Sequence, residues 1–214
     1  LEVDRTSCYV GEPVVATYKL YTRLKSESNL IKSPSFNGFS VIDLQMPDIT
    51  KYRVEKLNGV DYNVYTVRYS QLYPLLAGDL ELGSAEVENN VRFLREEFVR
   101  SRPDLFNGGM TEIPESMIPA EGMESQQLTL RNSPVIIKVK PLPEEGKPAG
   151  FAGAVGNFTI ETKIEKEQFS TDDGNRLAVI IGGEGNLPMV NALTVNWPSD
   201  RKSTRLNSSH RMPS

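Results

Sequence analysis

The chain has 214 residues, of which 38% are hydrophobic and 24% are charged, and its formal net charge is −4. This length suits one large domain or two domains of about 100 residues each, and the apolar fraction excludes global disorder. No stretch approaches the roughly 18 consecutive apolar residues that a membrane-spanning helix needs. An acidic chain is also a poor match for a nucleic-acid-binding protein.

The pattern of the first 93 residues predicts strands. Residues 14–23 alternate between apolar and polar side chains, as expected of a strand with one buried face, and Gly11-Glu12-Pro13 separates them from a strand at 1–10. Residues 24–38 are polar and predict a loop. Further strands are expected at 39–44, 51–57, 60–69, 72–76, 79–82 and 85–93. This spacing is typical of a β-sandwich or barrel.

The pair Asn58-Gly59 lies between the predicted strands 51–57 and 60–69. It is the strongest short signal for a hairpin, because a type I′ turn needs two residues with positive φ. Tyrosines gather around this hairpin, and on an exposed sheet face they can form a contact patch for protein or sugar. Tyrosine also simply suits strands. The candidate interaction residues are Tyr52, Tyr62, Tyr65 and Tyr69, with Tyr73 close by.

Residues 94–126 interrupt the strand rhythm. Residues 94–100 predict a short amphipathic helix, and the rest is rich in Pro, Gly and Met. We interpret 94–126 as a mobile insertion, either a helix followed by a loop or a disordered segment. Strand character resumes at 127–131 and 134–140.

A second domain is expected after a linker. Residues 141–150 contain three prolines and two glycines, which predicts a stiff, solvated linker. Strands at 157–165 and 176–181, with a turn at 170–175 between them, repeat the pattern of the first domain. Residues 151–199 are too few for a sandwich of about seven strands. The predicted fold is therefore all-β, with tandem immunoglobulin-like sandwiches over 1–140 and 151–199, the second one truncated and exposing an apolar face.

The last residues, 200–214, differ from the rest of the chain. They are polar and basic, lack periodicity, and contain the only histidine, His210. The run resembles the conceptual translation of a sequencing-adapter oligonucleotide, so we interpret it as an artefact and exclude it from the fold. Removing its four cations and one acid changes the net charge from −4 to −7. Without a histidine, a His-based zinc or catalytic site is a poor prediction.

Candidate catalytic and ligand-binding motifs are weak. Cys8 is the only cysteine and has no cationic neighbour, so we expect a buried apolar side chain. Acidic pairs occur at 96–97, 144–145 and 172–173, but adjacent acids diverge and do not face each other as glycoside hydrolysis requires. Residues 171–175 match only the start of a calcium loop; a turn is favoured over a weak cation site. The Gly-rich run 182–185 lacks the helix and lysine of a phosphate loop and predicts a plain loop.

Several motifs together resemble the BatD family, the exported aerotolerance proteins of Bacteroidota. The resemblance covers residues 1–199, and it is most specific at VGEPVVATYKLYTR (10–23) and GAVGNF (153–158). Supporting motifs are PSFNGFSV (34–41), LYP (72–74), GDLEL (78–82) and VKPLP (139–143).

The resemblance implies a periplasmic array of immunoglobulin-like domains, anchored in the inner membrane by a C-terminal helix. It also implies association with von Willebrand A-type and TPR Bat proteins and with a MoxR-type ATPase system. The family has no established catalytic residues, so none can be assigned here, and we expect no cofactor or metal. The chain lacks an initiator Met and the family's N-terminal domain, signal and anchor, so we expect a fragment. The leading hypothesis is a non-catalytic periplasmic scaffold for protein–protein contacts. The alternative is a carbohydrate-binding or adhesive module, and an enzyme using the acidic pairs is disfavoured.

Overall fold

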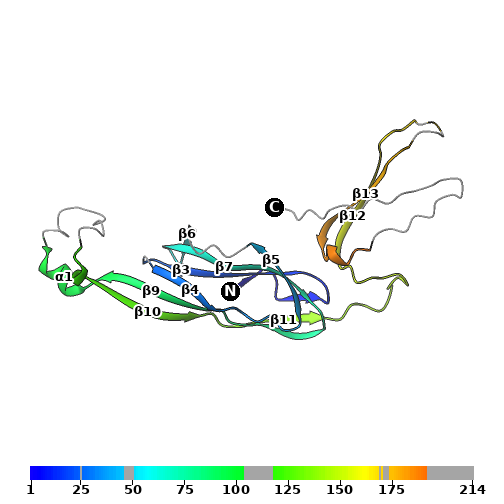
Figure 1. Ribbon diagram of the computed structural model, residues 1–214. Helices are drawn as coiled ribbons and strands as arrows, with labels where there is room; N and C mark the ends of the chain where they lie inside the picture. The colour runs from blue at the N-terminus through cyan, green and yellow to red at the C-terminus, as the bar shows by residue number, and fades with distance from the viewer. Residues whose placement is uncertain (25, 46–50, 104–117, 169, 171–173, 192–214) are drawn as a thin grey trace.

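The computed structural model describes residues 1–24, 26–45, 51–103, 118–168, 170 and 174–191. The chain is an all-β protein, with 57% of residues in strands and 8% in helices. Among the described helices, none combines the length and the apolar character needed to cross a membrane. The first strands form a two-layered sandwich, and a separate hairpin follows at one end (Figure 1).

The first layer is a five-stranded antiparallel sheet. Its strand order is β1-β3-β7-β5, and β6 pairs with the part of β7 that β5 leaves free. The strands are β1 (Glu2–Val3), β3 (Val14–Thr22), β5 (Phe39–Gln45), β6 (Tyr52–Leu57) and β7 (Val60–Pro74).

The second layer is a long ribbon in two successive parts. One part has the order β10-β9-β4 and the other β2-β11-β8. Two chain segments run through both parts. One segment forms β8 and then β9, and the other forms β10 and then β11. The strands are β2 (Ser7–Tyr9), β4 (Ser26–Lys32), β8 (Gly78–Leu82), β9 (Glu86–Leu94), β10 (Met123–Arg131) and β11 (Val135–Lys140).

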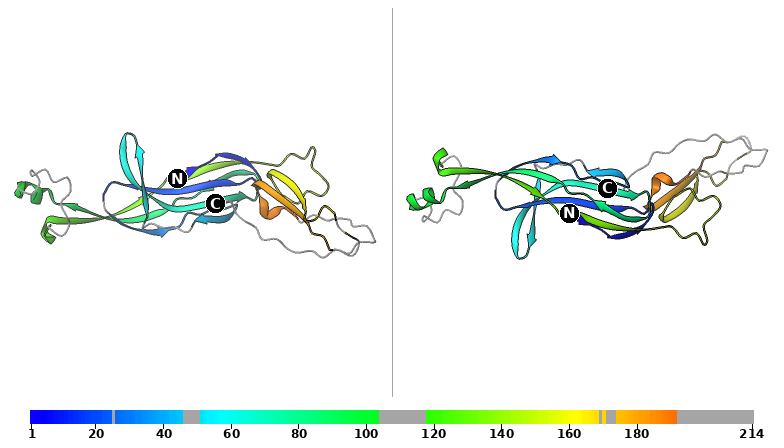
Figure 2. Two further views of the ribbon diagram at one scale, coloured as in Figure 1. Left: turned by 90° about the horizontal axis from the view of Figure 1, so that it is seen from above. Right: turned by 90° about the horizontal axis from the view of Figure 1, so that it is seen from below.

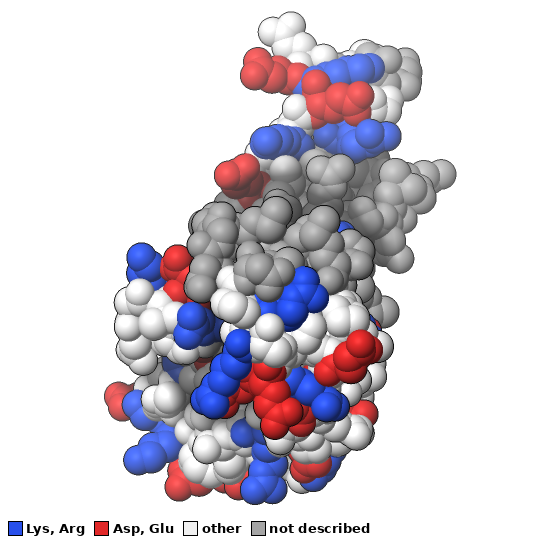
Figure 3. All heavy atoms as spheres, turned by 90° about the vertical axis from the view of Figure 1, so that its left-hand side faces the viewer, with Lys and Arg blue, Asp and Glu red and all other residues white. Residues whose placement is uncertain are grey.

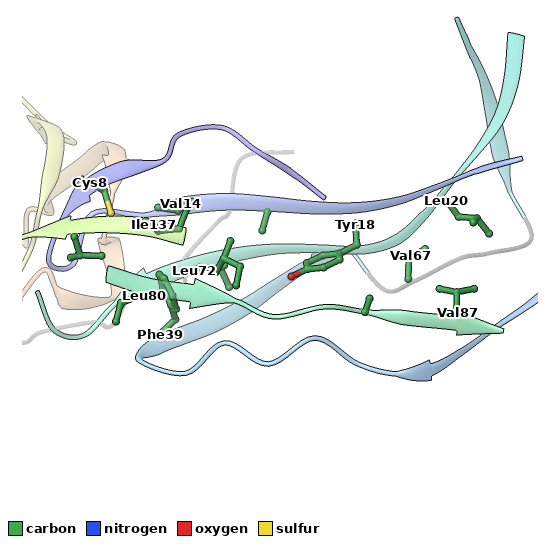
Figure 4. Close-up of a cluster of buried hydrophobic side chains, with 14 residues drawn as sticks. Cys8, Val14, Tyr18, Leu20, Phe39, Val67, Leu72, Leu80, Val87 and Ile137 are labelled. Carbon is green, nitrogen blue, oxygen red and sulfur yellow. The ribbon is translucent and has the colours of Figure 1, made fainter. Parts of the chain in front are cut away.

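The hydrophobic core lies between these two layers. Alternate residues of β3 point inward, as its period-2 pattern predicts, and every second side chain from Val14 to Thr22 is buried. Leu72 from the first layer and Ile137 from the second are completely buried (Figure 4). Leu82 of the second layer is completely buried as well. Cys8 is also buried in this core, as predicted, and its burial raises the pKa of the thiol to about 11.

Tyr18 is the main polar contact across the core. Its ring lies between the layers, and its hydroxyl donates a hydrogen bond of 2.8 Å to the carbonyl oxygen of Gly83. Burial raises the pKa of this hydroxyl to about 12, so it remains a donor at all physiological pH values. The contact ties β3 to the point where β8 becomes β9.

That point is a joint in the ribbon, at which neither of its two segments is a regular strand. The Gly83 amide donates to the carbonyl oxygen of Ser35 at 2.9 Å, and the backbone is so close that a Cβ on Gly83 would lie 2.4 Å from Ser35 Oγ. On the opposite segment, Asn132 Oδ1 accepts a hydrogen bond of 2.8 Å from the Ala85 amide. The side chain of Asn132 thus replaces a backbone partner where the ladder is interrupted.

The prediction of a single strand at 1–10 is wrong, because this segment forms two strands, β1 and β2, which belong to different layers. Asp4 Oδ1 accepts a hydrogen bond of 2.7 Å from the Val15 amide at the end of β1. Two residues later, the Thr6 carbonyl oxygen accepts one of 2.9 Å from the Lys138 amide. The chain therefore crosses from the first layer to the second between these residues.

Residues 24–38 are not only a loop, as predicted, since they contain β4. Its sequence is polar because it forms an edge of the second layer, where Ser28 donates to Asn89 Oδ1 at 2.7 Å. The strands predicted at 60–69 and 72–76 are one continuous strand, β7. The predicted break at 70–71 is therefore wrong, and the irregularity in β7 is instead a bulge at Val67, opposite Tyr18 and Lys19, which shifts the alternation.

The predicted insertion at 94–126 is partly a continuation of the ribbon. Strands β9 and β10 extend beyond the sandwich, and the short helix α1 (Glu96–Ser101) lies at their tip (Figures 1 and 2). The 3-10 helix η2 (Ala120–Gly122) leads into β10, and Gly122 leaves room for Phe98 to pack closely on it. Residues 104–117 lie outside the described part of the chain.

After the linker region, β12 (Gly156–Ile164) and β13 (Leu177–Gly185) form an antiparallel hairpin. The loop predicted at 182–185 is wrong, because these residues belong to β13. Gly185 leaves space for the Phe158 ring, since a Cβ there would lie 2.9 Å from Phe158 Cζ. Ile160 and Ile164 are 61% and 58% exposed, which confirms the expected apolar face. An apolar hollow of about 280 Å³ is lined by Ala154, Phe158, Thr159, Ile160, Ile181 and Val190.

Candidate interaction surface

The hairpin β6–β7 projects from the side of the sandwich (Figure 2). Its turn is formed by Asn58 and Gly59, which have φ angles of 53° and 80°. Two successive positive φ angles are what the Asn-Gly pair predicts, so this hairpin is confirmed. The register sets Leu57 opposite Val60 and Tyr52 opposite Tyr65.

The candidate tyrosines lie on two faces of the sheet. Tyr52 and Tyr65 are directly opposite each other and share the face that continues into the core. Tyr62 is three residues from Tyr65 and therefore points to the other face. The extra residue in β7, Val67, shifts the alternation, so Tyr69 shares the face of Tyr62. Proximity in sequence thus does not produce one tyrosine patch, and Tyr73 is buried.

The inner face of the hairpin is an exposed extension of the core. Tyr65 packs against the core cluster, and the Tyr52 ring lies 5.5 Å from it at an angle of 49°. Tyr52 itself is 55% exposed, and Val54, two residues further along the same face, is 62% exposed. We call Tyr52, Val54 and Tyr65 the Tyr52 face. The Tyr52 face is thus held to the core through Tyr65, while Tyr52 and Val54 remain exposed to solvent and available for contact.

The outer face of the hairpin carries an ion-pair network. Lys19 Nζ lies 2.8 Å from Glu2 and 3.4 Å from Glu55, and the Tyr21 hydroxyl is 3.1 Å from both of these carboxylates. The hydrogen bond from Lys19 lowers the pKa of Glu2, and the same bond raises the pKa of Lys19. Tyr62 packs edge-on against Tyr21 with centroids 6.1 Å apart. The network joins β1, β3 and β6 and fixes the base of the hairpin.

A second ion pair joins β5 and β7. Arg68 donates to both oxygens of Asp43, at 3.0 and 3.3 Å, and its guanidinium lies 4.8 Å from the Phe36 ring centroid. Ser70 is completely buried and donates to Asp43 at 2.5 Å. The hydrogen bonds from Arg68 and then Ser70 lower the pKa of Asp43.

This lowered pKa predicts an acid-sensitive contribution to stability. The folded pKa of Asp43 lies below its ordinary value of 3.8, so the contribution is complete above that value and is lost as the pH falls through the folded pKa. We expect Asp43→Asn to destabilise the fold at pH 7, and the difference from wild type to shrink below about pH 4. Urea unfolding, monitored by circular dichroism, measures the destabilisation at pH 7 and its decrease at low pH. Asp79→Asn, at an exposed position of β8, is the control, and a difference that stays constant with pH would contradict the assignment.

The other predicted features do not form a chemical site in the described residues. No group of three or more His, Cys, Asp or Glu side chains in that part of the chain is placed to hold a metal ion. Glu96 and Glu97 lie in the first turn of α1 and point to solvent. Figure 3 shows acidic and basic side chains interspersed on this end of the molecule. The Asp-rich residues 171–173 and the basic run 200–214 lie outside the description.

Comparisons of the chain with protein-family models, curated proteins and solved structures found no match. The function therefore has to be inferred from the surfaces of the molecule and from the motifs of the sequence. Among these surfaces the Tyr52 face combines exposed aromatic and aliphatic groups with a rigid support. Sequence reasoning selected Tyr52 and Tyr65 but missed Val54, whose signal was its position two residues after Tyr52 on the same face of the strand.

Proposed function

We propose that this chain is part of a non-catalytic scaffold of the BatD type, which binds other proteins in the periplasm through its β-sandwich modules. The Tyr52 face carries this proposal. Tyr52 and Val54 are more than half exposed, and aromatic residues are enriched in the buried centres of protein interfaces. On this reading the sandwich and the hairpin after the linker are consecutive immunoglobulin-like modules of an anchored parent protein.

The support of the Tyr52 face suits it for binding. The Tyr65 ring holds Tyr52 from the core side, and Lys19 and Glu55 join β6 to the sheet on the other side of the hairpin. A side chain that is already ordered loses little conformational entropy when it binds, so more of the contact energy appears as affinity. A partner with an apolar concave surface is the expected complement.

The resemblance of the sequence motifs to BatD proteins supplies the partner class. Its expected partners are von Willebrand A-type and TPR Bat proteins, together with a MoxR-type ATPase system. We place the von Willebrand A-type domain on the Tyr52 face, because this face combines exposed apolar side chains with a rigid support. TPR proteins would then occupy a different surface of the same assembly.

The proposal predicts that Tyr52→Ser combined with Val54→Ser weakens binding of a von Willebrand A-type Bat domain by about tenfold or more, because interface anchors each contribute roughly 1–2 kcal/mol. Titration of the full chain against the purified domain, by calorimetry or interferometry, measures this change. Leu57→Ser is the matched control, since Leu57 is 44% exposed in the same strand but points to the opposite face. Equal affinity for wild type and the double variant would contradict the proposal.

A carbohydrate-binding module is the second candidate, and the exposed ring of Tyr52 favours it. An aromatic ring with one free face can stack against a sugar ring. A glycan array gives a separate result for this alternative. Glycan binding that disappears in Tyr52→Ala, without any binding of a von Willebrand A-type domain, would replace the scaffold proposal.

A further inference from the structure

The outer edge of the ribbon is only partly covered. Strand β2 pairs in parallel with β11 along this edge, from Lys138 to Lys140. Further along the same edge, β10 pairs with β9 on one side and with no described strand on the other. This open edge is nine residues long, with the sequence MESQQLTLR.

The open edge of β10 lacks several of the features that normally protect an edge strand, and its two charged residues lie near its ends. Such edges are blunted by lysine, proline or a bulge. Strand β10 contains neither lysine nor proline, and its register with β9 has no shift. Two other edges of the sandwich are protected: β4 has a register shift beside Lys32, and β6 carries Lys56.

The hydrogen bonds at the two ends of β10 show which backbone groups point outward. The Arg95 amide donates to the Gly122 carbonyl oxygen at 3.0 Å, and at the other end the Ala85 amide points toward Asn132. The backbone amide and carbonyl groups of the even-numbered residues of β10 therefore point toward β9, because the bonding direction alternates along an antiparallel strand. The amide and carbonyl groups that point to the open edge belong to Met123, Ser125, Gln127, Thr129 and Arg131.

We propose that this edge pairs antiparallel with β10 of a second copy of the chain, which makes one continuous sheet across a two-fold axis at Gln127. In this register each outward residue meets another outward residue, with Ser125 opposite Thr129 and Gln127 opposite itself. Two-fold symmetry makes such an interface self-complementary. This self-association stands on the strand edge alone and does not depend on the proposed binding by the Tyr52 face.

Charge and apolar exposure fit this occupant. Strand β10 has one acid, Glu124, near its start and one base, Arg131, at its end. Antiparallel pairing brings the acidic end of one copy beside the basic end of the other and places no like charges opposite each other. Leu128 and Leu130, each 39% exposed, would lie opposite Gln126 and Glu124 of the second copy and lose part of their contact with water.

Charged substitutions at Gln127 test the proposal. Sedimentation equilibrium of the full chain, at concentrations up to about 100 µM, measures self-association in the micromolar Kd range. We expect wild type and Gln127→Ala to dimerise. Gln127→Lys and Gln127→Glu should each weaken the dimer by about tenfold, because they place like charges opposite each other, and a mixture of the two should restore association as a heterodimer.

A backbone variant provides the second measurement. Gln127→Pro removes an amide that points to the open edge and leaves the bonds to β9 intact, a position at which a strand tolerates proline. It should be folded by circular dichroism and monomeric. A monomeric wild type would overturn the proposal, and so would a dimer that all of these variants leave unchanged. Capture of an added extended peptide by a monomeric wild type would assign the edge to a different occupant.

Discussion

Leu72→Ala is expected to lower the free energy of unfolding by about 3 kcal/mol, within the range for complete truncation of a buried leucine. Leu72 lies near the C-terminal end of β7, opposite Val14 of β3 and Val41 of β5, and is completely buried. Removal of its side chain leaves a cavity between the two layers, which cannot collapse fully because β3 and β5 hold β7 in place on both sides. Urea unfolding monitored by circular dichroism measures the loss.

Leu76→Ala is the control for this change. Leu76 follows the same strand but is 53% exposed, so we expect the variant to stay within about 0.5 kcal/mol of wild type. If Leu72→Ala were no more destabilising than Leu76→Ala, the two layers would not enclose the core as described.

Gly83→Ala is expected to destabilise the protein by about 1–3 kcal/mol, the usual cost of forcing extra atoms into a packed site. A Cβ at this position would lie 2.4 Å from Ser35 Oγ and 3.0 Å from the Ser35 amide nitrogen. The added methyl group therefore has to displace backbone as well as side chain. The Tyr18 hydrogen bond to Gly83 would move with it. Thermal unfolding and near-ultraviolet circular dichroism report the loss.

Gly150→Ala provides the comparison for Gly83→Ala. No atom lies within 4 Å of a Cβ built on Gly150, so this variant should unfold at the same temperature as wild type or slightly higher. Similar melting temperatures for both variants would show that the joint of the ribbon yields easily. The close packing of Gly83 against Ser35 would then not limit the stability of the fold.

Strands with one buried face could be predicted well from the sequence. In β3 the alternation from Val14 to Thr22 matches the burial pattern residue by residue, and the Asn58-Gly59 turn has the expected backbone. These features are local, since they depend on side-chain period and on φ alone. The all-β class followed from their repetition.

Features that depend on distant partners could not be predicted. Strand β4 has a polar sequence and is recognisable only through its pairing with β9. The bulge at Val67 changes which face Tyr69 occupies, and it exists because β3 and β7 pair out of step beyond Tyr18. The grouping of the tyrosines into two faces therefore required the register. Val54 is a different case, because its position two residues after Tyr52 already indicates a shared face of the strand; only its exposure required the structure.

The parallel pairing of β2 with β11 has a mechanical consequence. If the chain is pulled between Leu1 and the 141–150 linker, the tension runs along both strands in opposite directions. The ladder from Ser7 to Tyr9 and from Lys138 to Lys140 is then sheared, so its hydrogen bonds must fail together instead of one after another. The antiparallel β1 would peel from β3 first, because its two residue pairs can open in sequence. Forced unfolding depends on the rate of such a rupture more than on equilibrium stability, so this short parallel contact makes the sandwich resistant to stretching along its own chain.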